Sequence, residues 1–384
     1  MSDLNVEHAL DGPWMFREAG THEWLPATVP GTVHTDLLAN GRIDDPFYRT
    51  SERTVQWVDK RDWEYRTTLE LAPEMLSEAR IELVFYGLDT YADVYLNDAP
   101  ILRTDNMFRT WVADIRALAR AGENDLRILL RSPVREGLER LEVFGYNPPA
   151  AVDWSEIGGL GDRKISPFIR KAPYHFGWDW GPRLVTSGIW RAVRLRAWSG
   201  ARIAAFEIVQ RALSQDEARL TAVLDIDSDA RTPVTLDLTS PDDPAVSARS
   251  EIHLMPGAQQ VQIDFAVHKP RRWWTNGLGE AFLYRFCAVL AGPRLRHCRD
   301  VRVGLRTLRI VQTPDEHGQC FYIELNGLPV FMKGANYIPN DSFPPRVSRT
   351  VYERIVRSAA ETNMNMLRVW GGGIYEDDLF YGFT

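Results

Sequence analysis

Aromatic residues crowd around one carboxylate near the middle of the chain, in residues 173 to 183. The stretch reads Pro-Tyr-His-Phe-Gly-Trp-Asp-Trp-Gly-Pro-Arg, and Asp179 is its only acid. Glycine and proline near both ends predict a loop rather than a strand. A sugar ring can stack its CH face on tryptophan while a carboxylate accepts hydrogen bonds from two of its hydroxyl groups. The residues leave a second interpretation open, in which Asp179 only satisfies backbone N–H groups of an aromatic corner.

Carboxylates also gather near the end of the chain. Asp341 lies on a proline-rich stretch, and residues 376–378 read Glu-Asp-Asp. Glycoside cleavage needs two carboxyl groups, about 5–5.5 Å apart for retention or about 6.5–9.5 Å apart for inversion. Three consecutive acids instead suit the first turn of a helix, where they complement its dipole. Asp341 could rim a site or cap the backbone, so no pair stands out as an acid and a nucleophile.

Other chemistries find less support in the sequence. There is no Gly-x-Ser-x-Gly elbow, and Gly371–Gly373 lacks the Lys-Ser/Thr of a phosphate-binding loop. Cys287, Cys298 and Cys320 are odd in number and irregularly spaced, which indicates structural cysteines of a reduced compartment rather than a zinc site. We therefore expect neither a metal nor a cofactor.

The aromatic stretch belongs to a first all-β region, residues 1 to 198. Short runs of strand character recur between turn signals, and two helical interruptions are expected at residues 36–39 and 133–143. This pattern predicts a two-sheet sandwich or jelly roll. The strand candidates are residues 65–71, 81–86, 92–96, 125–130 and 190–198.

A second β region follows in residues 199 to 300. Its short strand candidates are separated by Asp, Pro, Gly and Ser, on the scale of an immunoglobulin-like sandwich. Residues 271–277 read Arg-Arg-Trp-Trp-Thr-Asn-Gly, which we interpret as a turn whose aromatics seal a domain edge. The strand candidates are residues 204–209, 220–226, 234–238, 251–254, 261–267 and 282–290.

From residue 301 the pattern changes to mixed α and β. A strand is expected over residues 301–311, followed by a hairpin of residues 321–325 and 329–332 around Asn326-Gly327. The apolar run 328–332, a helix over 351–362 and a second run over 364–369 then form a βαβ unit.

Ligands of such units sit outside the carboxyl ends of the strands. Asn336 follows the first apolar run, and Trp370 with three glycines, beginning at Gly371, follows the second. These residues are therefore candidates for a binding site.

Composition narrows the function classes. The 384 residues include 13 Trp, carry a net charge of −7 and are 45% hydrophobic. The acidic balance argues against nucleic acid, which favours basic patches. No apolar run approaches the length of a membrane helix. The N-terminus has no basic segment followed by an apolar one, so we expect no signal peptide and a cytoplasmic location.

Four motifs, in this order, resemble the N-terminal part of the β-mannosidase branch of glycoside hydrolase family 2. They are VPGTVHTDLLANGRIDDPFYR (29–49), FGWDWGPRLVTSGIWR (176–191), RRWWTNGLGEAFLY (271–284), and KGANYIPNDSFPPR with NMNMLRVWGGGIYEDD (333–378). The resemblance implies a mostly β, multidomain chain. Its parts would be a jelly-roll sugar-binding domain over residues 1–198, an immunoglobulin-like β-sandwich over 199–300, and the start of a truncated (β/α)8 TIM barrel over 301–384.

The resemblance also implies a function. The complete enzyme would remove terminal β-D-mannosyl residues from non-reducing ends by a retaining double displacement, acting on β-mannoside oligosaccharides or glycan remnants. Trp178 and Asp179 resemble the loop that this branch sends into the subsite for the cleaved sugar. Trp370 and Gly371 resemble a wall of that subsite, and Asn336 resembles a polar residue lining it.

One departure concerns the catalytic pair. A (β/α)8 barrel takes about 250 residues, and this chain supplies about two of the eight units. The two glutamates of the family belong to later strands, so we expect them beyond Thr384 and expect the chain alone to be inactive. The last residues, 380–384, also depart from the family, which a frameshift or an incomplete reading frame would explain.

Two kinds of alternative stay open. The chain could be a non-catalytic carbohydrate-binding protein or pseudo-enzyme. It could also belong to a related exo-glucosaminidase or endo-acting mannosidase of the same family.

Overall fold

The computed structural model describes residues 6–10, 12–293 and 295–384. The chain forms two compact units, and each is built from several stretches of sequence. The larger unit holds residues 7–197, 337–353 and 369–384. The smaller unit holds residues 198–336 and 354–368, together with Val6.

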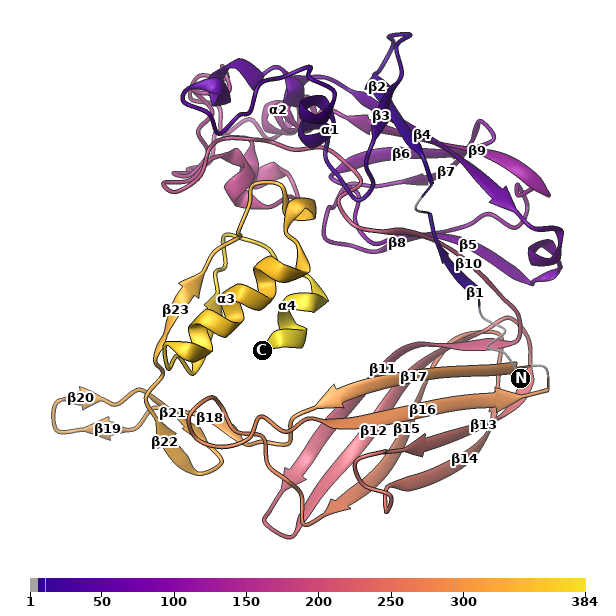
Figure 1. The fold of residues 1–384 in the computed structure, drawn as a ribbon, viewed down its shortest axis with the longest axis vertical. Helices are drawn as coiled ribbons and strands as arrows, with labels where there is room; N and C mark the ends of the chain where they lie inside the picture. The colour runs from indigo at the N-terminus through magenta and orange to yellow at the C-terminus, as the bar shows by residue number, and fades with distance from the viewer. Residues whose placement is uncertain (1–5, 11, 294) are drawn as a thin grey trace. The chain divides into compact units, whose positions relative to one another are not determined.

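Two β-sheets make up the first part of the chain, as the sequence predicted (Figure 1). The six-stranded sheet has the order β3-β2-β4-β9-β6-β7, and the four-stranded sheet has the order β1-β10-β5-β8. The strands are β1 Val6–Ala9, β2 Trp14–Glu18, β3 Leu25–Ala27, β4 Trp63–Leu71, β5 Arg80–Phe85, β6 Tyr91–Leu96, β7 Ala99–Arg103, β8 Trp111–Asp114, β9 Gly122–Arg131 and β10 Val193–Trp198.

Strand β4 shows why these sheets form. From Tyr65 onward its side chains alternate strictly between buried and exposed, so that Tyr65, Leu69 and Leu71 enter the core. Tyr65 pairs with Ile128 of β9, and a shift of one residue would turn this whole apolar set toward solvent. The period of two therefore fixes both the sheet and its register.

Two helices interrupt these strands where the sequence predicted them. Helix α1, Val33–Ala39, begins with a capping box between Thr32 and Thr35. Helix α2, Pro133–Phe144, begins at the N-cap Ser132 and ends at Gly145 in the left-handed conformation. The 3₁₀ helices of the chain are Ser51–Val55, Val58–Lys60, Pro73–Ser77, Ser166–Phe168, Pro173–Phe176 and Pro344–Arg346.

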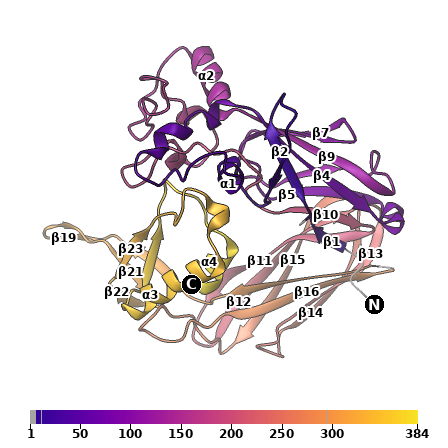
Figure 2. The same cartoon turned by 45° about the horizontal axis from the view of Figure 1, so that its top comes forward.

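The smaller unit contains a second two-sheet sandwich (Figures 1 and 2). One sheet has the order β11-β12-β15, the other has the order β14-β13-β16-β17, and Leu224, Leu236 and Phe286 are fully buried in its core. Its strands are β11 Ala201–Leu213, β12 Glu217–Ser228, β13 Thr232–Thr239, β14 Ser247–Leu254, β15 Gly257–His268, β16 Tyr284–Gly292 and β17 Leu295–Val303.

The strand predicted over residues 301–311 is wrong, because the chain leaves the sheet in the middle of it. Strand β17 ends at Val303, and Leu305 turns its carbonyl to the backbone N–H of Trp273 at 2.9 Å instead of to a sheet neighbour. Strand β18 then begins a separate three-stranded sheet, β18-β21-β22. The strands of this part are β18 Leu308–Val311, β19 Pro314–Asp315, β20 Gly318–Gln319, β21 Tyr322–Leu325 and β22 Leu328–Val330.

The Asn-Gly hairpin is confirmed. Leu325 of β21 pairs with Leu328 of β22, and both turn residues between them adopt positive φ, 51° at Asn326 and 84° at Gly327. Positive φ at both central residues is the requirement of the tightest hairpin turn, and Asn-Gly meets it at low cost.

The βαβ unit exists, but its first strand is not the one expected. The apolar run of residues 328–332 contains strand β22 of the preceding hairpin, and the βαβ unit begins later, at β23 Gly334–Tyr337. Helix α3, Arg349–Glu361, then leads to β24, Met366–Val369, and helix α4, Asp378–Phe383, follows. Asn336 therefore lies inside a strand and not beyond its end.

Strands β23 and β24 form a two-stranded sheet. Met366 N–H bonds the carbonyl of Lys333 at 3.3 Å and Trp370 N–H bonds that of Tyr337 at 2.9 Å, so the strands run in parallel. A Cβ on Gly334 would lie 1.9 Å from the carbonyl oxygen of Met366, which explains why glycine occupies this position. In the described part of the chain, none of the helices has the length and apolar content needed to cross a membrane.

Candidate functional site

The aromatic stretch forms a loop, as its glycines and prolines predicted. Trp178 and Gly181 exchange two backbone hydrogen bonds, of 3.1 and 3.3 Å, so that Asp179 and Trp180 form the tip. Gly177 enters the loop with φ of +106°, and a Cβ there would lie 2.7 Å from the indole of Trp154. The loop is thus a hydrogen-bonded tight turn that packs against Trp154.

Trp178 and Trp370 come together although 192 positions separate them in the sequence. Their ring centres are 4.5 Å apart at an interplanar angle of 82°. Trp180 also meets the Trp370 ring edge-on at 5.7 Å, and Tyr174 lies 5.7 Å from Trp180. Trp178 and Trp370 are only partly buried, so the cluster presents aromatic surface to a ligand.

Asp179 is exposed at the tip of this loop. Among the described residues its carboxylate has neither a hydrogen bond nor an ion pair, so the interpretation in which it satisfies backbone N–H groups does not hold. A free carboxylate flanked by two tryptophans is available to the hydroxyl groups of a ligand.

The glycines after β24 shape the chain beside Trp370. Gly373 N–H bonds the carbonyl of Trp370 at 3.1 Å, which closes a turn, and Gly371 has open space around its α-carbon. Ile374 then packs into the aromatic cluster. Asn336 lies in the smaller unit, where its amide oxygen accepts a hydrogen bond from Arg368 Nη1 at 3.0 Å.

A buried polar network lies at the base of the aromatic loop. Lys171 and Asp89 form an ion pair with side chains 0% and 1% exposed. Thr186 Oγ1 accepts a hydrogen bond from Lys171 Nζ at 2.6 Å and donates one to Asp89 Oδ2 at 2.6 Å. A buried charge pair is stable only when its remaining hydrogen-bonding groups are also satisfied, and Thr186 provides that.

His175 connects this network to the segment after β23. Its Nε2 lies 3.0 Å from the carbonyl oxygen of Ser342, and its Nδ1 lies 3.3 Å from Thr186 Oγ1. Burial, assisted by the charge of Lys171, holds the pKa of His175 well below its ordinary value. His34 stacks on Phe343 nearby, and the same causes lower its pKa to about 3.

Both rings are therefore neutral at physiological pH. Nothing in the sequence pointed to the partners of these two histidines.

Three of the acids near the end of the chain, Asp341, Glu376 and Asp377, have structural partners. Asp341 receives two hydrogen bonds from Arg346, of 2.9 and 2.7 Å. Asp377 is the N-cap of α4 and accepts from Leu379 N–H at 2.9 Å, which confirms a helix-start role. Glu376 is buried, accepts from Tyr352 Oη at 2.9 Å, and has its pKa raised by that burial.

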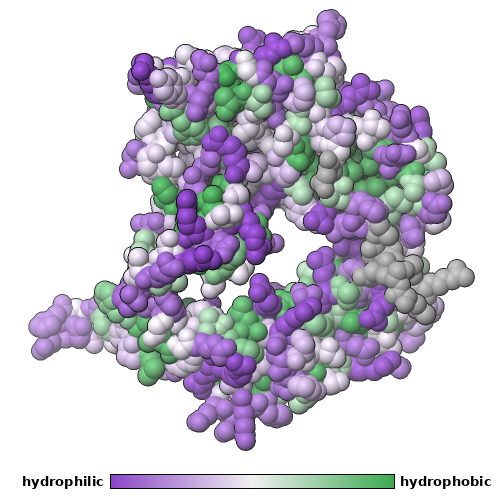
Figure 3. Space-filling view, in the orientation of Figure 1, coloured by the Kyte–Doolittle hydropathy of each residue, from purple (hydrophilic) through white to green (hydrophobic). Residues whose placement is uncertain are grey.

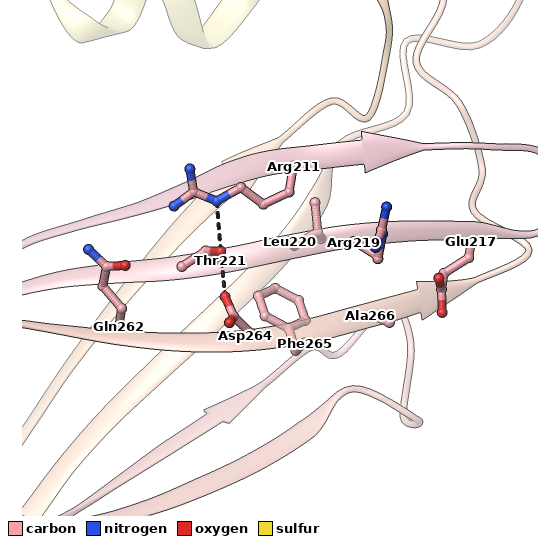
Figure 4. Close-up of a pocket in the computed structure, with 9 residues that line it drawn as sticks. All are labelled: Arg211, Glu217, Arg219, Leu220, Thr221, Gln262, Asp264, Phe265 and Ala266. Atoms are coloured by element: carbon pink, nitrogen blue, oxygen red, sulfur yellow. Dashed lines mark hydrogen bonds between the residues drawn. The ribbon is translucent and has the colours of Figure 1, made fainter.

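An open hollow lies elsewhere, over β11, β12 and β15 of the smaller unit (Figure 4). It has a volume of about 690 Å³ and is open. Arg211 Nε donates to Thr221 Oγ1 at 2.9 Å, and Thr221 donates to Asp264 at 2.6 Å, so its central polar groups bond one another. Phe265 packs on the core residue Phe286. Because its one lining aromatic, Phe265, packs on the core, this hollow is a poorer candidate for a sugar site than the loop with several partly exposed tryptophans.

No group of His, Cys, Asp and Glu among residues 6–10, 12–293 and 295–384 is arranged to hold a metal ion. Cys287 and Cys320 are free thiols.

Family comparisons agree with this architecture. Residues 14–191 match the glycosyl hydrolase 2 galactose-binding domain-like family, and residues 201–306 match glycosyl hydrolases family 2. The chain is 35% identical over 388 residues to β-mannosidase B of Emericella nidulans, a match that covers 98% of this chain. The chain corresponds to the N-terminal portion of proteins of the β-mannosidase branch of glycoside hydrolase family 2. It is also 33% identical over 391 residues to the β-mannosidase of Bos taurus.

Two solved structures show a similar fold. The β-D-mannosidase of Dictyoglomus thermophilum is 39% identical and superimposes over 98% of this chain with a TM-score of 0.91. An exo-chitosanase of Amycolatopsis orientalis superimposes with a TM-score of 0.74 at 20% identity, which shows a shared fold alone.

This family 2 chain spans less than half the length of these relatives. It covers 44% of the Emericella protein, 43% of the bovine protein and 46% of the Dictyoglomus protein.

Proposed function

We propose that this chain forms the sugar-binding wall of a β-mannosidase-type glycoside hydrolase. The observation that carries the proposal is the unpartnered carboxylate of Asp179 at the tip of a loop whose Trp178 packs on Trp370. The substrate would be a terminal, non-reducing β-D-mannosyl residue of an oligosaccharide or glycan remnant. The names and fold of the relatives support this choice of sugar.

Each site residue has a proposed role. The partly exposed faces of Trp178 and Trp370 stack on the CH face of the sugar, and Asp179 accepts hydrogen bonds from two of its hydroxyl groups. Gly371 leaves room for the ring, and Asn336 supplies a polar contact. We assign this binding function to a jelly-roll domain of residues 1–198 and the start of a (β/α)8 barrel at residues 301–384, with an immunoglobulin-like sandwich at 199–300 between them.

We place the catalytic carboxyl pair outside residues 1–384. Asp341, Glu376 and Asp377 are each held by structural partners, which supports that assignment. In the complete enzyme two glutamates would act with retention, one as nucleophile and one as acid and base. The chain alone is then expected to show no turnover of an aryl β-mannoside.

The test is a calorimetric titration of the chain with methyl β-D-mannopyranoside. Asp179→Ala should weaken binding by more than about tenfold, because hydrogen bonds to a charged group contribute about 1.5–3 kcal/mol. Asp162→Ala is the matched control, since Asp162 is also an exposed loop acid. Equal affinities of the chain and Asp179→Ala would refute the site.

Turnover assays distinguish part of a glycoside hydrolase from a non-catalytic carbohydrate-binding protein. A chain that binds the mannoside through Asp179 without cleaving an aryl β-mannoside is also what a carbohydrate-binding protein would give. Adding the remaining barrel segment of a family 2 relative in trans or by fusion should produce cleavage only if the chain can act as part of an enzyme.

A further inference from the structure

A second, smaller pocket lies in the larger unit, where strand ends meet helix α2. Its volume is about 370 Å³. Tyr91 begins β6 and is the register partner of Arg131, which ends β9. Arg103 at the end of β7, Trp111 at the start of β8 and Arg140 of α2 complete its walls. We call it the Tyr91 pocket, and none of its walls comes from the 173–183 loop.

Tyr91 gives this pocket an unused hydrogen-bonding group. The residue is 1% exposed, and its hydroxyl has no hydrogen-bond partner among the described residues. The guanidinium groups of Arg140 and Arg131 lie 4.9 and 5.6 Å from the centre of its ring. Buried polar groups normally find a partner, so an orphan hydroxyl on a residue that lines a pocket points to a ligand that supplies one.

The charges around the pocket balance. Arg103 and Arg131 both pair with Asp93, at 3.4 and 3.1 Å, and Arg131 also pairs with Glu136. The third guanidinium, Arg140, faces a pocket that also contains the exposed Asp105. Three arginines and three acids leave no net charge to attract a phosphate or a carboxylate. A neutral ligand that both donates and accepts hydrogen bonds fits this balance better.

Two of these groups have spare capacity. Arg140 makes one long hydrogen bond, from Nη1 to the carbonyl of Phe168 at 3.4 Å. The carboxylate of Asp105 makes no hydrogen bond or ion pair within the described residues. A guanidinium offers a planar fork of donors, a carboxylate offers paired acceptors, and vicinal hydroxyl groups can use both.

Trp111 supplies an apolar wall. Its indole is fixed by a hydrogen bond from Nε1 to the carbonyl of Asn106 at 3.1 Å. The CH face of a sugar ring can pack on such a fixed indole. The volume is at the lower end of the about 300–1,000 Å³ typical of small-molecule sites, which suits one ring and not an extended chain.

We propose that the Tyr91 pocket binds one neutral pyranose ring. Arg140 donates to two adjacent hydroxyl groups, Asp105 accepts from another, and the hydroxyl of Tyr91 gains the partner that it lacks. The pocket would give the chain a saccharide site that does not depend on Asp179 or on the function proposed above.

The experiment uses the 384-residue chain with Trp178→Ala and Asp179→Ala, so that the loop site is removed. Methyl β-D-mannopyranoside is titrated by calorimetry or by saturation-transfer NMR, and saturable binding at one site is expected. Adding Arg140→Gln should weaken that binding about tenfold, and adding Tyr91→Phe about fivefold. Tyr91→Phe should leave the melting temperature unchanged, because the hydroxyl has no partner in the free chain.

Arg135→Gln is the matched control. Arg135 lies on the same helix, pairs with Asp62 and does not line the pocket, so this variant should bind as tightly as its parent. The proposal fails if the chain lacking the loop site shows no saturable binding, or if Arg140→Gln and Tyr91→Phe bind as tightly as Arg135→Gln. Binding of inorganic phosphate in place of the mannoside would refute the ligand class.

The two proposals can fail separately. If Asp179→Ala alone has no effect while Arg140→Gln abolishes binding, the Tyr91 pocket stands and the loop site falls. If binding disappears completely with Asp179→Ala, the loop site stands and the Tyr91 pocket falls.

Discussion

The Nε2 atom of His175 lies 3.0 Å from the carbonyl oxygen of Ser342, which is 167 residues further along the chain. A carbonyl can only accept, so Nε2 must carry the hydrogen. Burial and the charge of Lys171 hold the pKa of His175 low, which keeps the ring neutral. The bond therefore joins the base of the Trp178 loop to the segment after β23 over the whole physiological pH range.

We expect His175 to act as a positioning residue for the loop. His175→Ala leaves the Ser342 carbonyl unpaired in a buried place and should lower the free energy of unfolding by about 1–3 kcal/mol. It should also weaken the binding of methyl β-D-mannopyranoside, because the loop loses its anchor. Urea unfolding and calorimetric titration measure the two effects.

His175→Gln is the matched variant, since its amide nitrogen can donate at nearly the same place. It should recover most of the mannoside affinity even where some stability is lost. Equal loss of affinity in the Ala and Gln variants would show that the ring's packing matters and the hydrogen bond does not.

Gly177 sets the entry of the same loop. Its φ of +106° is costly for any residue with a side chain, and an added Cβ would lie 2.7 Å from the Trp154 indole. Gly177→Ala should therefore destabilise the chain by about 2 kcal/mol or more and impair mannoside binding. Gly181→Ala in the same loop is the control, because a Cβ there meets nothing within 4 Å. Similar melting temperatures for both variants would contradict this account.

Local patterns in the sequence predicted much of the fold. Alternation along β4 and the Asn326-Gly327 turn are local signals, and both gave the observed structure. Glycine and proline around Asp179 correctly indicated a loop. These successes share a cause, because each depends on residues that are close in the sequence.

Contacts between distant residues could not be predicted in this way. Lysine is usually exposed, yet Lys171 is fully buried because Asp89 and Thr186 surround it. Strand β23 reads Gly-Ala-Asn-Tyr and carries no strand period, since its pairing with β24 determines it. The packing of Trp178 on Trp370 followed only from the family resemblance.

Several large apolar side chains of the smaller unit are exposed, from which we predict self-association of the chain. Phe331 is 84% exposed, and Leu308, Ile310 and Leu328 are each more than half exposed. Figure 3 shows hydrophobic surface in the region that carries β21 and β22. The chain should therefore bind an environment-sensitive apolar dye and self-associate at high concentration. Phe331→Ser should reduce dye fluorescence, and a monodisperse chain without dye binding would contradict the expectation.

Asp36 should give the chain a measurable pH dependence. It lies in α1 and accepts hydrogen bonds from Tyr65 Oη at 2.6 Å and from Thr28 N–H at 2.9 Å. Burial outweighs these bonds and raises the pKa of Asp36 to about 6, from 3.8. The folded state thus holds this proton more tightly than the unfolded state does. The resulting stability is present below about pH 4 and is lost as the pH rises to about 6.

The two buried histidines complicate a direct measurement, because their lowered pKa values make stability rise over part of the same range. The difference between the chain and Asp36→Asn isolates the carboxyl group. That difference should move in favour of the variant by about 3 kcal/mol between pH 4 and pH 7, since one pKa unit corresponds to about 1.4 kcal/mol. Asp44→Asn, an exposed acid, should show no such trend, and a flat difference for Asp36→Asn would rule out the shift.

The tryptophan-rich turn has a role that its sequence did not suggest. Asn276 Nδ2 donates to the carbonyls of Ala360 at 2.9 Å and Met364 at 3.0 Å, at the C-terminal end of α3. Ala360 lies in the last turn of α3 and also accepts from Asn363 N–H at 3.0 Å, whereas Met364 lies beyond the end of the helix, so Asn276 ties the end of α3 to the segment that follows it. Asn276→Asp keeps the shape but replaces the donors with acceptors.

The Asn276→Asp variant should lower the free energy of unfolding by about 1–3 kcal/mol and increase amide hydrogen exchange in α3. Asn147→Asp, whose amide donates to Asp162 in an exposed loop, is the control and should change neither quantity in α3. If hydrogen exchange in α3 is unchanged in Asn276→Asp, the hydrogen bonds from the turn of residues 271–277 do not stabilise α3.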